Sequence, residues 1–152
     1  EYSVDLEGEH LLYDAQTSTY FDTHFLRAGA GVSIDLAGKG KLKIMPRVAR
    51  LFCPDLAEER YEEYTLAAGY EILTGRGYWF SISYEPGNRN YLNESEGVYS
   101  DFYVHRISAM AGITVAGDIT ADLFLIHDPE YHSRREDDFS ITLISISLSR
   151  TF

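Results

Sequence analysis

The chain of 152 residues is poor in cysteine, proline and positive charge, and these shortages narrow the class of protein. Its single cysteine, Cys53, has no second thiol in the chain for a disulfide, so cysteine usage does not report the redox compartment. No apolar run approaches the roughly 18 residues of a transmembrane helix, which excludes a helical span but not a membrane barrel. Only 13 Lys and Arg oppose 24 Asp and Glu, a formal net charge of -11. Nucleic acid is therefore not an expected partner, because phosphate-binding surfaces carry the opposite sign.

Aromatic residues and glycine are abundant, and apolar residues alternate with polar ones along most of the chain. There are 12 Tyr, 8 Phe and 12 Gly, a mixture that suits strands joined by tight turns. Their connections alternate between short Gly-bearing turns and longer polar loops, which indicates a single domain, 1–152, built as an antiparallel up-and-down meander. The alternation predicts eight strands, at residues 1–13, 23–37, 40–52, 60–74, 77–86, 100–116, 118–128 and 138–152.

Each predicted strand has one apolar face and one face rich in Gly and Ser with scattered charges. Strand 77–86, for example, sets Phe80 and Ile82 against Ser81. An eight-stranded barrel has a narrow interior, so small residues there leave room for a few long charged side chains. Large apolar side chains on its outside would form an untenable patch in water but suit a bilayer. We therefore predict an eight-stranded transmembrane β-barrel. Its polar, filled lumen is expected to hold a charge network of Glu7, Glu9, Arg27, Asp35, Lys43, Arg47, Glu63, Glu71, Glu85, Arg106 and Asp122.

The last predicted strand ends on an aromatic residue, and its apolar residues share the parity of that residue. Ile144, Ile146, Leu148 and Phe152 follow this pattern, whereas Arg150 departs from it. The segment resembles the C-terminal signal of Gram-negative outer-membrane β-barrel proteins. The resemblance implies recognition by the barrel-assembly machinery, closure of the last strand against the first, and a place in the outer membrane among its lipids and lipopolysaccharide.

By elimination, we expect a non-enzymatic surface-interaction or membrane-structural protein that needs no metal or cofactor. Its long loops would face outward and contact an extracellular ligand whose identity the sequence does not specify. Aromatic side chains carry much of the binding energy at interfaces. The candidate contact residues in these loops are Tyr20, Phe21, Tyr91, Tyr99 and Tyr131.

Three alternatives stay open. A narrow, porin-like channel would require an ion path through the lumen charges, and the chain could also be the C-terminal barrel part of an export or secretion protein. The third alternative is a barrel enzyme that modifies lipid A. Lipid A deacylases carry a His-x-Ser motif late in the barrel, but here Pro129 stands two residues after His127, and His132 and Ser133 are adjacent in a predicted loop.

Overall fold

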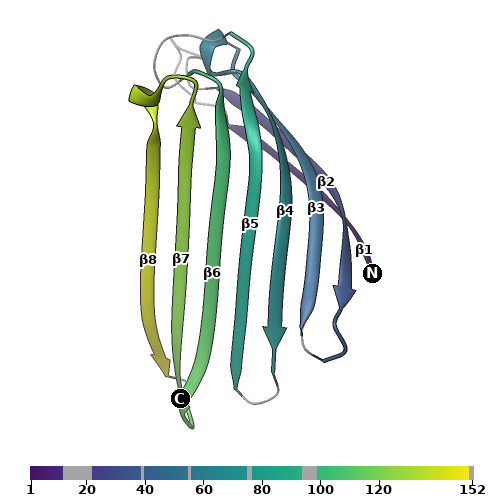
Figure 1. Ribbon diagram of the computed structural model, residues 1–152, viewed down its shortest axis with the longest axis vertical. Helices are drawn as coiled ribbons and strands as arrows, with labels where there is room; N and C mark the ends of the chain where they lie inside the picture. The colour runs from purple at the N-terminus through teal and green to yellow at the C-terminus, as the bar shows by residue number, and fades with distance from the viewer. Residues whose placement is uncertain (12–21, 39, 55, 75–76, 94–98, 151–152) are drawn as a thin grey trace.

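The computed structural model describes residues 1–11, 22–38, 40–54, 56–74, 77–93 and 99–150, which form one antiparallel β-sheet (Figure 1). Within these ranges no helix is long and apolar enough to cross a membrane. Two single turns of 3-10 helix are η1 (Ala57–Glu59) and η2 (Arg135–Asp137). The strands are β1 (Tyr2–Leu11), β2 (Thr23–Asp35), β3 (Lys41–Phe52), β4 (Tyr61–Leu73), β5 (Tyr78–Tyr91), β6 (Phe102–Ala116), β7 (Ile119–His132) and β8 (Phe139–Arg150).

Each strand pairs with its neighbours in the sequence, in the order β1 to β8, so the predicted up-and-down meander is confirmed. The connections also alternate as predicted. Those at the top of Figure 1 include η1 and η2, whereas those at the bottom are tight turns. Gly77, directly before β5, has a φ of 77°, a backbone conformation that glycine adopts without a steric penalty. Local turn chemistry and strand alternation therefore suffice to explain the topology.

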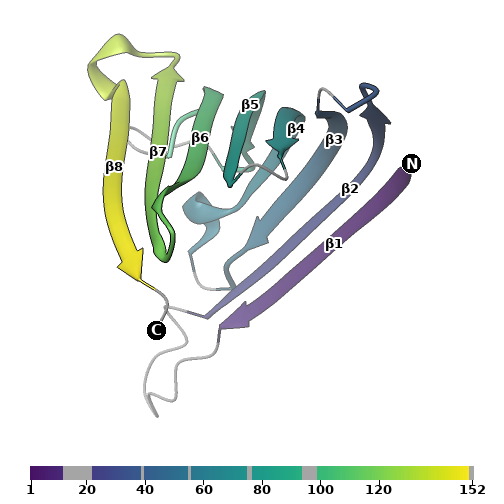
Figure 2. The ribbon, with the colours of Figure 1, turned by 90° about the horizontal axis from the view of Figure 1, so that it is seen from below.

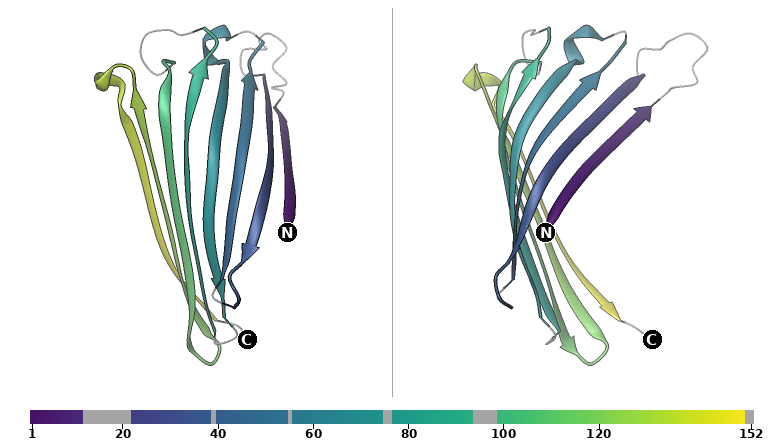
Figure 3. Two further views of the ribbon diagram at one scale, coloured as in Figure 1. Left: turned by 45° about the vertical axis from the view of Figure 1, so that its right-hand side comes forward. Right: turned by 90° about the vertical axis from the view of Figure 1, so that its right-hand side faces the viewer.

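The sheet is strongly curved but open. Seen from below, it forms an arc with β1 and β8 at its two margins (Figure 2), and in the side view these edge strands run apart (Figure 3). Among the described residues no backbone pairing joins β1 to β8. The prediction of eight antiparallel strands is confirmed, whereas the predicted closure into a barrel is not observed.

Two strands reach further toward the long loops than the sequence predicts. β5 continues to Tyr91 and β7 to His132, beyond their predicted ends at 86 and 128. Gly87 and the asparagines that follow it have low β-propensity, so the sequence predicts a loop here. Backbone pairing outweighs that propensity, since Gly87 pairs with Thr65 on β4 and with Val104 on β6.

Gly87 lies where β5 passes very close to β4. A Cβ at this position would overlap the carbonyl oxygen of Tyr64 and lie 2.6 Å from Cγ2 of Thr65. We expect Gly87→Ala to destabilise the folded protein by about 1–3 kcal/mol, because the neighbouring backbone moves aside only by breaking its ladder. The matched control is Gly8→Ala, whose Cβ would meet nothing within 4 Å and should not lower stability. Urea unfolding followed by circular dichroism measures both, and equal midpoints would contradict the crowding argument.

The two faces of the sheet differ sharply in exposure. We call outer the face that carries the even-numbered residues of β1 to β5, and inner the opposite face. On the inner face, side chains two strands apart meet, such as Glu63 of β4 and Arg106 of β6, so this face is concave. Glu63 is only 3% exposed there, whereas Tyr2 and Ile146 on the outer face are 90% and 75% exposed. This distribution reverses the usual one, in which apolar side chains are buried and charges are exposed.

The inner face is not uniformly polar. Ile126 of β7 pairs directly with Leu143 of β8, and on its other side it opposes Ser108 of β6. Ile141 and Leu143 are both about half exposed on this face. The predicted polar face is therefore interrupted by an apolar patch on β7 and β8, although parity within β8 already places Leu143 on the same face as Ser145.

Candidate functional site: an ion-pair network on the inner face

Glu63 lies at the centre of an ion-pair network that spans β4 to β7. Its carboxylate accepts hydrogen bonds from Arg106 at 2.8 and 3.0 Å, and from Arg89 at 2.6 and 2.9 Å. Arg106 also contacts Asp128 of β7 at 3.4 Å. The planar guanidinium fork matches a carboxylate in shape, so these side chains hold one another in one arrangement.

A second group of charges lies beside the first, closer to β1. Arg47 of β3 pairs with Glu85 of β5 at 2.9 Å and approaches Asp5 of β1 at 3.7 Å. The other carboxylate oxygen of Glu85 accepts a hydrogen bond from the Thr65 hydroxyl at 2.6 Å. Both oxygens of Glu85 are therefore engaged, and the group ties together β1, β3, β4 and β5.

Glycine on the inner face of β2 allows the Arg47 side chain of β3 to reach across β2 toward β1. A Cβ at Gly29 would lie 2.9 Å from Cγ of Arg47, and one at Gly31 would lie 2.9 Å from Cβ of Met45. Side chains of β3 therefore lie over the backbone of β2, and this is how Arg47 approaches Asp5. The glycines of β2 therefore provide room for the longer side chains of β3.

The structure brings together some of the predicted lumen charges and separates others. At the tight-turn end, Asp35 of β2 and Glu71 of β4 each lie directly opposite Lys41 of β3. Lys41 itself forms an ion pair with Glu1 at 3.1 Å. The predicted residues that form ion pairs on the inner face are Glu7, Arg27, Arg47, Glu63, Glu85 and Arg106. Among the described residues, none of these ion pairs involves Glu9, Asp35, Lys43, Glu71 or Asp122.

Three members of the network were missed by the sequence analysis. Arg89 lies beyond the predicted end of its strand, although its odd number gives it the inner parity once β5 is extended. Asp5 and Asp128 have the parity of the inner face of their strands, so strand parity was a sufficient signal for both. The curvature of the sheet decides which charged side chains meet across two strands. No local sequence pattern predicts this pairing.

Aromatic rings cover the network at the loop end. The Tyr91 ring lies 5.8 Å from that of Tyr61 and 6.3 Å from that of Phe102. The guanidinium of Arg89 lies 4.0 Å from the Tyr61 centroid and 5.0 Å from the Phe102 centroid, distances typical of cation–π attraction. Tyr91 was assigned to a loop, but it lies in β5 and packs within this inner cluster.

The other predicted contact residues occupy different places. Tyr131 lies in β7 rather than in a loop, and its ring meets His105 edge-on at 5.4 Å. Tyr99 precedes β6, and its hydroxyl donates a hydrogen bond to Glu59 at 2.8 Å. Tyr20 and Phe21 fall outside the described residues.

The predicted assembly pattern lies on the outer face of β8. Ile144, Ile146 and Leu148 are all well exposed there, which is the accessibility that recognition of this strand would require. Phe152 lies outside the described residues.

A serine and a histidine meet at the loop end in an arrangement that the sequence did not indicate. Oγ of Ser100 lies 2.8 Å from Nδ1 of His132, and Nε2 of His132 lies 3.6 Å from a Glu130 oxygen. Nucleophilic catalysis would need a reachable hydroxyl, but Ser100 is only 4% exposed. The pair therefore joins the loop before β6 to β7 rather than offering a nucleophile.

The histidine considered for a lipid A enzyme, His127, lies in β7. His127 lies on the outer face, where Nδ1 is 2.9 Å from the Thr142 hydroxyl, and the hydrogen bonds of the described residues give it no carboxylate partner. Among the described residues, no three His, Cys, Asp or Glu side chains converge in a way that could hold a metal ion.

Cys53 follows β3 and is completely buried. Burial raises the pKa of its thiol to about 11, and Glu59, 3.6 Å away, acts in the same direction. Since an unfolded thiol has a pKa near 8.5, the protonated thiol favours the folded state below about pH 8.5, and this contribution is lost as the pH rises toward 11.

We expect Cys53 to react with iodoacetamide at pH 8 at least about 100-fold more slowly in the folded protein than in urea, because the thiolate is scarce and covered. A single exposed cysteine in the variant Cys53→Ser/Asn93→Cys is the control and should react at the same rate in both states. Equal rates for folded and unfolded Cys53 would show that the thiol is accessible.

Comparisons of the chain with protein family models, with curated proteins and with solved structures found no match. The interpretation of the site therefore rests on its geometry.

Proposed function

We propose that this chain forms a transmembrane β-barrel of the Gram-negative outer membrane and acts without catalysis, as a surface-interaction or membrane-structural protein. The observation that carries the proposal is the reversed distribution of side chains. Glu63 is buried on the concave face and its two arginine partners are only partly exposed there, while apolar side chains such as Ile44 and Val48 are exposed on the convex face. Acyl chains would cover that face at no cost, whereas water would not.

The dimensions and the tyrosines of the outer face support the same proposal. The strands contain 10 to 15 residues, and about 10 residues tilted near 45° suffice to cross a bilayer. Exposed Tyr78 lies near the tight turns, while exposed Tyr64 and Tyr103 lie toward the long loops. Membrane barrels carry aromatic residues at both edges of their apolar band, where the rings meet the lipid headgroups.

Closure of the sheet belongs to the proposal. In the described sheet β1 and β8 each have a neighbouring strand on one side only, and a bilayer offers no partner for the backbone groups of an open sheet edge. The two strands run in opposite directions, so an antiparallel pairing between them would satisfy both edges. Closure would also enclose the apolar patch around Ile126 and Leu143, which the open sheet leaves partly exposed.

The first experiment compares boiled and unboiled samples of the detergent-extracted protein on an SDS gel, beside circular dichroism. A β-rich spectrum with migration that changes on boiling supports a closed membrane barrel. A protein that stays soluble without detergent and does not shift on boiling would overturn the proposal.

A second experiment tests the closure of the sheet. It uses cysteine pairs between β1 and β8, such as Leu6→Cys with Ile144→Cys, Ile146→Cys or Leu148→Cys, in a Cys53→Ser background. If no pair cross-links in a heat-modifiable protein, further strands separate β1 from β8, as in a larger export or secretion barrel.

A narrow channel is a second candidate, because the inner face carries many charges in a row across β1 to β7. The network argues against it, since both oxygens of Glu63 and both of Glu85 are engaged with other side chains. Planar-bilayer recordings decide between the two. The proposal predicts no discrete current steps, whereas steps that change in size in Arg47→Gln or Arg106→Gln would favour the channel.

A further inference from the structure

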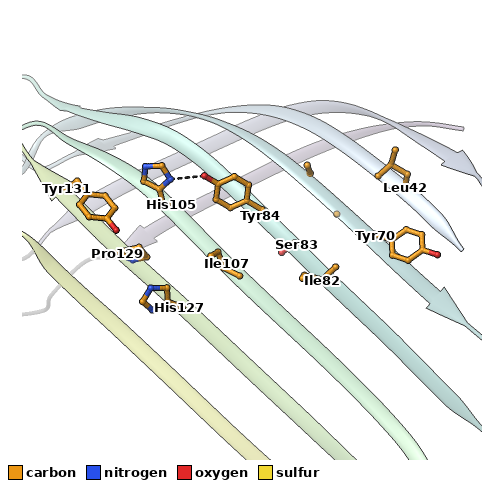
Figure 4. Close-up of a pocket in the computed structure, with 12 residues that line it drawn as sticks. Leu42, Tyr70, Ile82, Ser83, Tyr84, His105, Ile107, His127, Pro129 and Tyr131 are labelled. Carbon is orange, nitrogen blue, oxygen red and sulfur yellow. Dashed lines mark hydrogen bonds between the residues drawn. The ribbon is translucent and has the colours of Figure 1, made fainter.

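The outer face carries an apolar groove that crosses β3 to β7. Its volume is about 690 Å³, and Figure 4 shows the side chains that line it. The residues that line it include the apolar side chains of Ala68, Ile82 and Ile107 and the rings of Tyr84 and Tyr131. A groove of this size with so few polar atoms suits a hydrocarbon chain, because burial of each CH₂ group is favourable and non-directional.

The end of the groove nearest the long loops is ordered by polar contacts. The hydroxyl of Tyr84 lies 2.8 Å from Nδ1 of His105 (Figure 4). The His105 ring in turn meets Tyr131 edge-on, at 5.4 Å between centroids. These contacts fix the orientation of the Tyr131 ring, which forms the boundary between the groove and the region closer to the loops.

A polar pocket adjoins the groove at this boundary. Its volume is about 460 Å³, and Tyr131 lines both the pocket and the groove. The pocket is also lined by Tyr103 and by the polar side chains of Asn88, Asn90 and Asp101. Nδ2 of Asn88 donates to Oδ1 of Asn90 at 3.0 Å, and both amides keep further donor and acceptor capacity for a ligand.

The lining of the polar pocket indicates which headgroup it would accept. Phosphate groups are usually recognised by Arg or Lys, but the described lining contains neither and includes the carboxylate of Asp101. Amides, a carboxylate and tyrosine rings instead offer donors, acceptors and flat apolar surfaces. These are complementary to a saccharide, which presents hydroxyl groups at its edges and C–H groups on its faces.

We propose that the groove and the pocket together bind one glycolipid, with an acyl chain in the groove and a saccharide headgroup against Tyr131 and the two asparagines. The site rests on the proposed membrane function, because only a lipid-facing groove would meet such a ligand in place. It also deepens that function, since it assigns a defined lipid to one position on the outer face.

The test uses native mass spectrometry of the heat-modifiable protein in tetraethylene glycol monooctyl ether, a detergent without sugar. The probes are dipalmitoyl monoglucosyl-diacylglycerol and dipalmitoyl phosphatidylglycerol, which share acyl chains and differ in headgroup. We expect one glucolipid per protein, bound about tenfold more tightly than the phospholipid, the preference that one to two hydrogen bonds confer.

Variants separate the two parts of the site. Asn88→Ala/Asn90→Ala should abolish the preference for the glucolipid, and Tyr131→Ala should weaken binding of both lipids. Tyr64→Ala is the matched control, because Tyr64 is a similarly exposed tyrosine of the outer face that lines neither cavity. Equal affinities for the two lipids, or equal losses in Tyr64→Ala and Tyr131→Ala, would overturn the glycolipid site while leaving a heat-modifiable barrel intact. Failure of the membrane function is recognised separately, as a wild-type protein that does not shift on boiling.

Discussion

Glu63→Gln is expected to destabilise the folded protein by about 3 kcal/mol. The substitution removes a single negative charge that faces two guanidinium groups, at 2.6 Å from Arg89 and 2.8 Å from Arg106. Breaking a buried ion pair typically costs about 3–5 kcal/mol, because the remaining charge is left without a partner. We expect a loss at the lower end of this range of free energies, because the two arginine side chains are 17% and 25% exposed and are partly screened by solvent.

Urea unfolding of the detergent-folded protein, followed by circular dichroism, would measure this loss. The matched control is Glu7→Gln, because Glu7 also pairs with one arginine, Arg27, but its side chain is 54% exposed. That variant should lose less than about 1 kcal/mol. If both variants lost the same amount, burial of the network would not be what gives Glu63 its large effect.

A double variant isolates the charge effect from a change in packing. In the background Glu63→Gln, the further change Arg89→Gln removes one of the two cations that faced Glu63 and should restore part of the lost stability. A coupling free energy near zero between the two positions would show that Glu63 and Arg89 act independently.

Ile44→Lys is expected to lower the stability of the protein in phospholipid vesicles by about 2–4 kcal/mol. Ile44 is 41% exposed on the outer face, between Val32 of β2 and Ala68 of β4. If this face meets acyl chains, a lysine in the middle of the apolar band must be taken out of water. In a water-exposed sheet the same change would fall within about 0.5 kcal/mol of neutral.

The measurement is the fraction of unboiled protein in the folded band after folding into vesicles over a range of urea concentrations. Leu92→Lys is the control, because Leu92 is equally exposed but follows the end of β5 at the loop end. It should fold as the wild type does. If Ile44→Lys folds as well as Leu92→Lys, the outer face does not lie in lipid.

Strand alternation and turn chemistry determined most of the architecture. The number of strands, their order and the alternation of long and short connections follow from local rules, because an antiparallel strand needs only a two-fold side-chain period and a turn that reverses the chain. Parity likewise assigned Glu63, Arg106, Arg47 and Glu85 to one face. The errors fall at the loop ends of β5 and β7, where pairing with neighbouring strands extends segments that have low intrinsic β-propensity.

Contacts between strands that are not neighbours were decided only by the tertiary structure. Parity places Arg106 on the inner face, but the curvature of the sheet selects Glu63, two strands away, as its partner. The polar pocket that Tyr131 shares with the groove also depends on tertiary structure. Residues from β5, β6 and β7 line this pocket together only because the three strands pair in one register. Local sequence patterns carry no information about curvature or register between distant segments, and these two properties create both the buried ion pairs and the outer cavities.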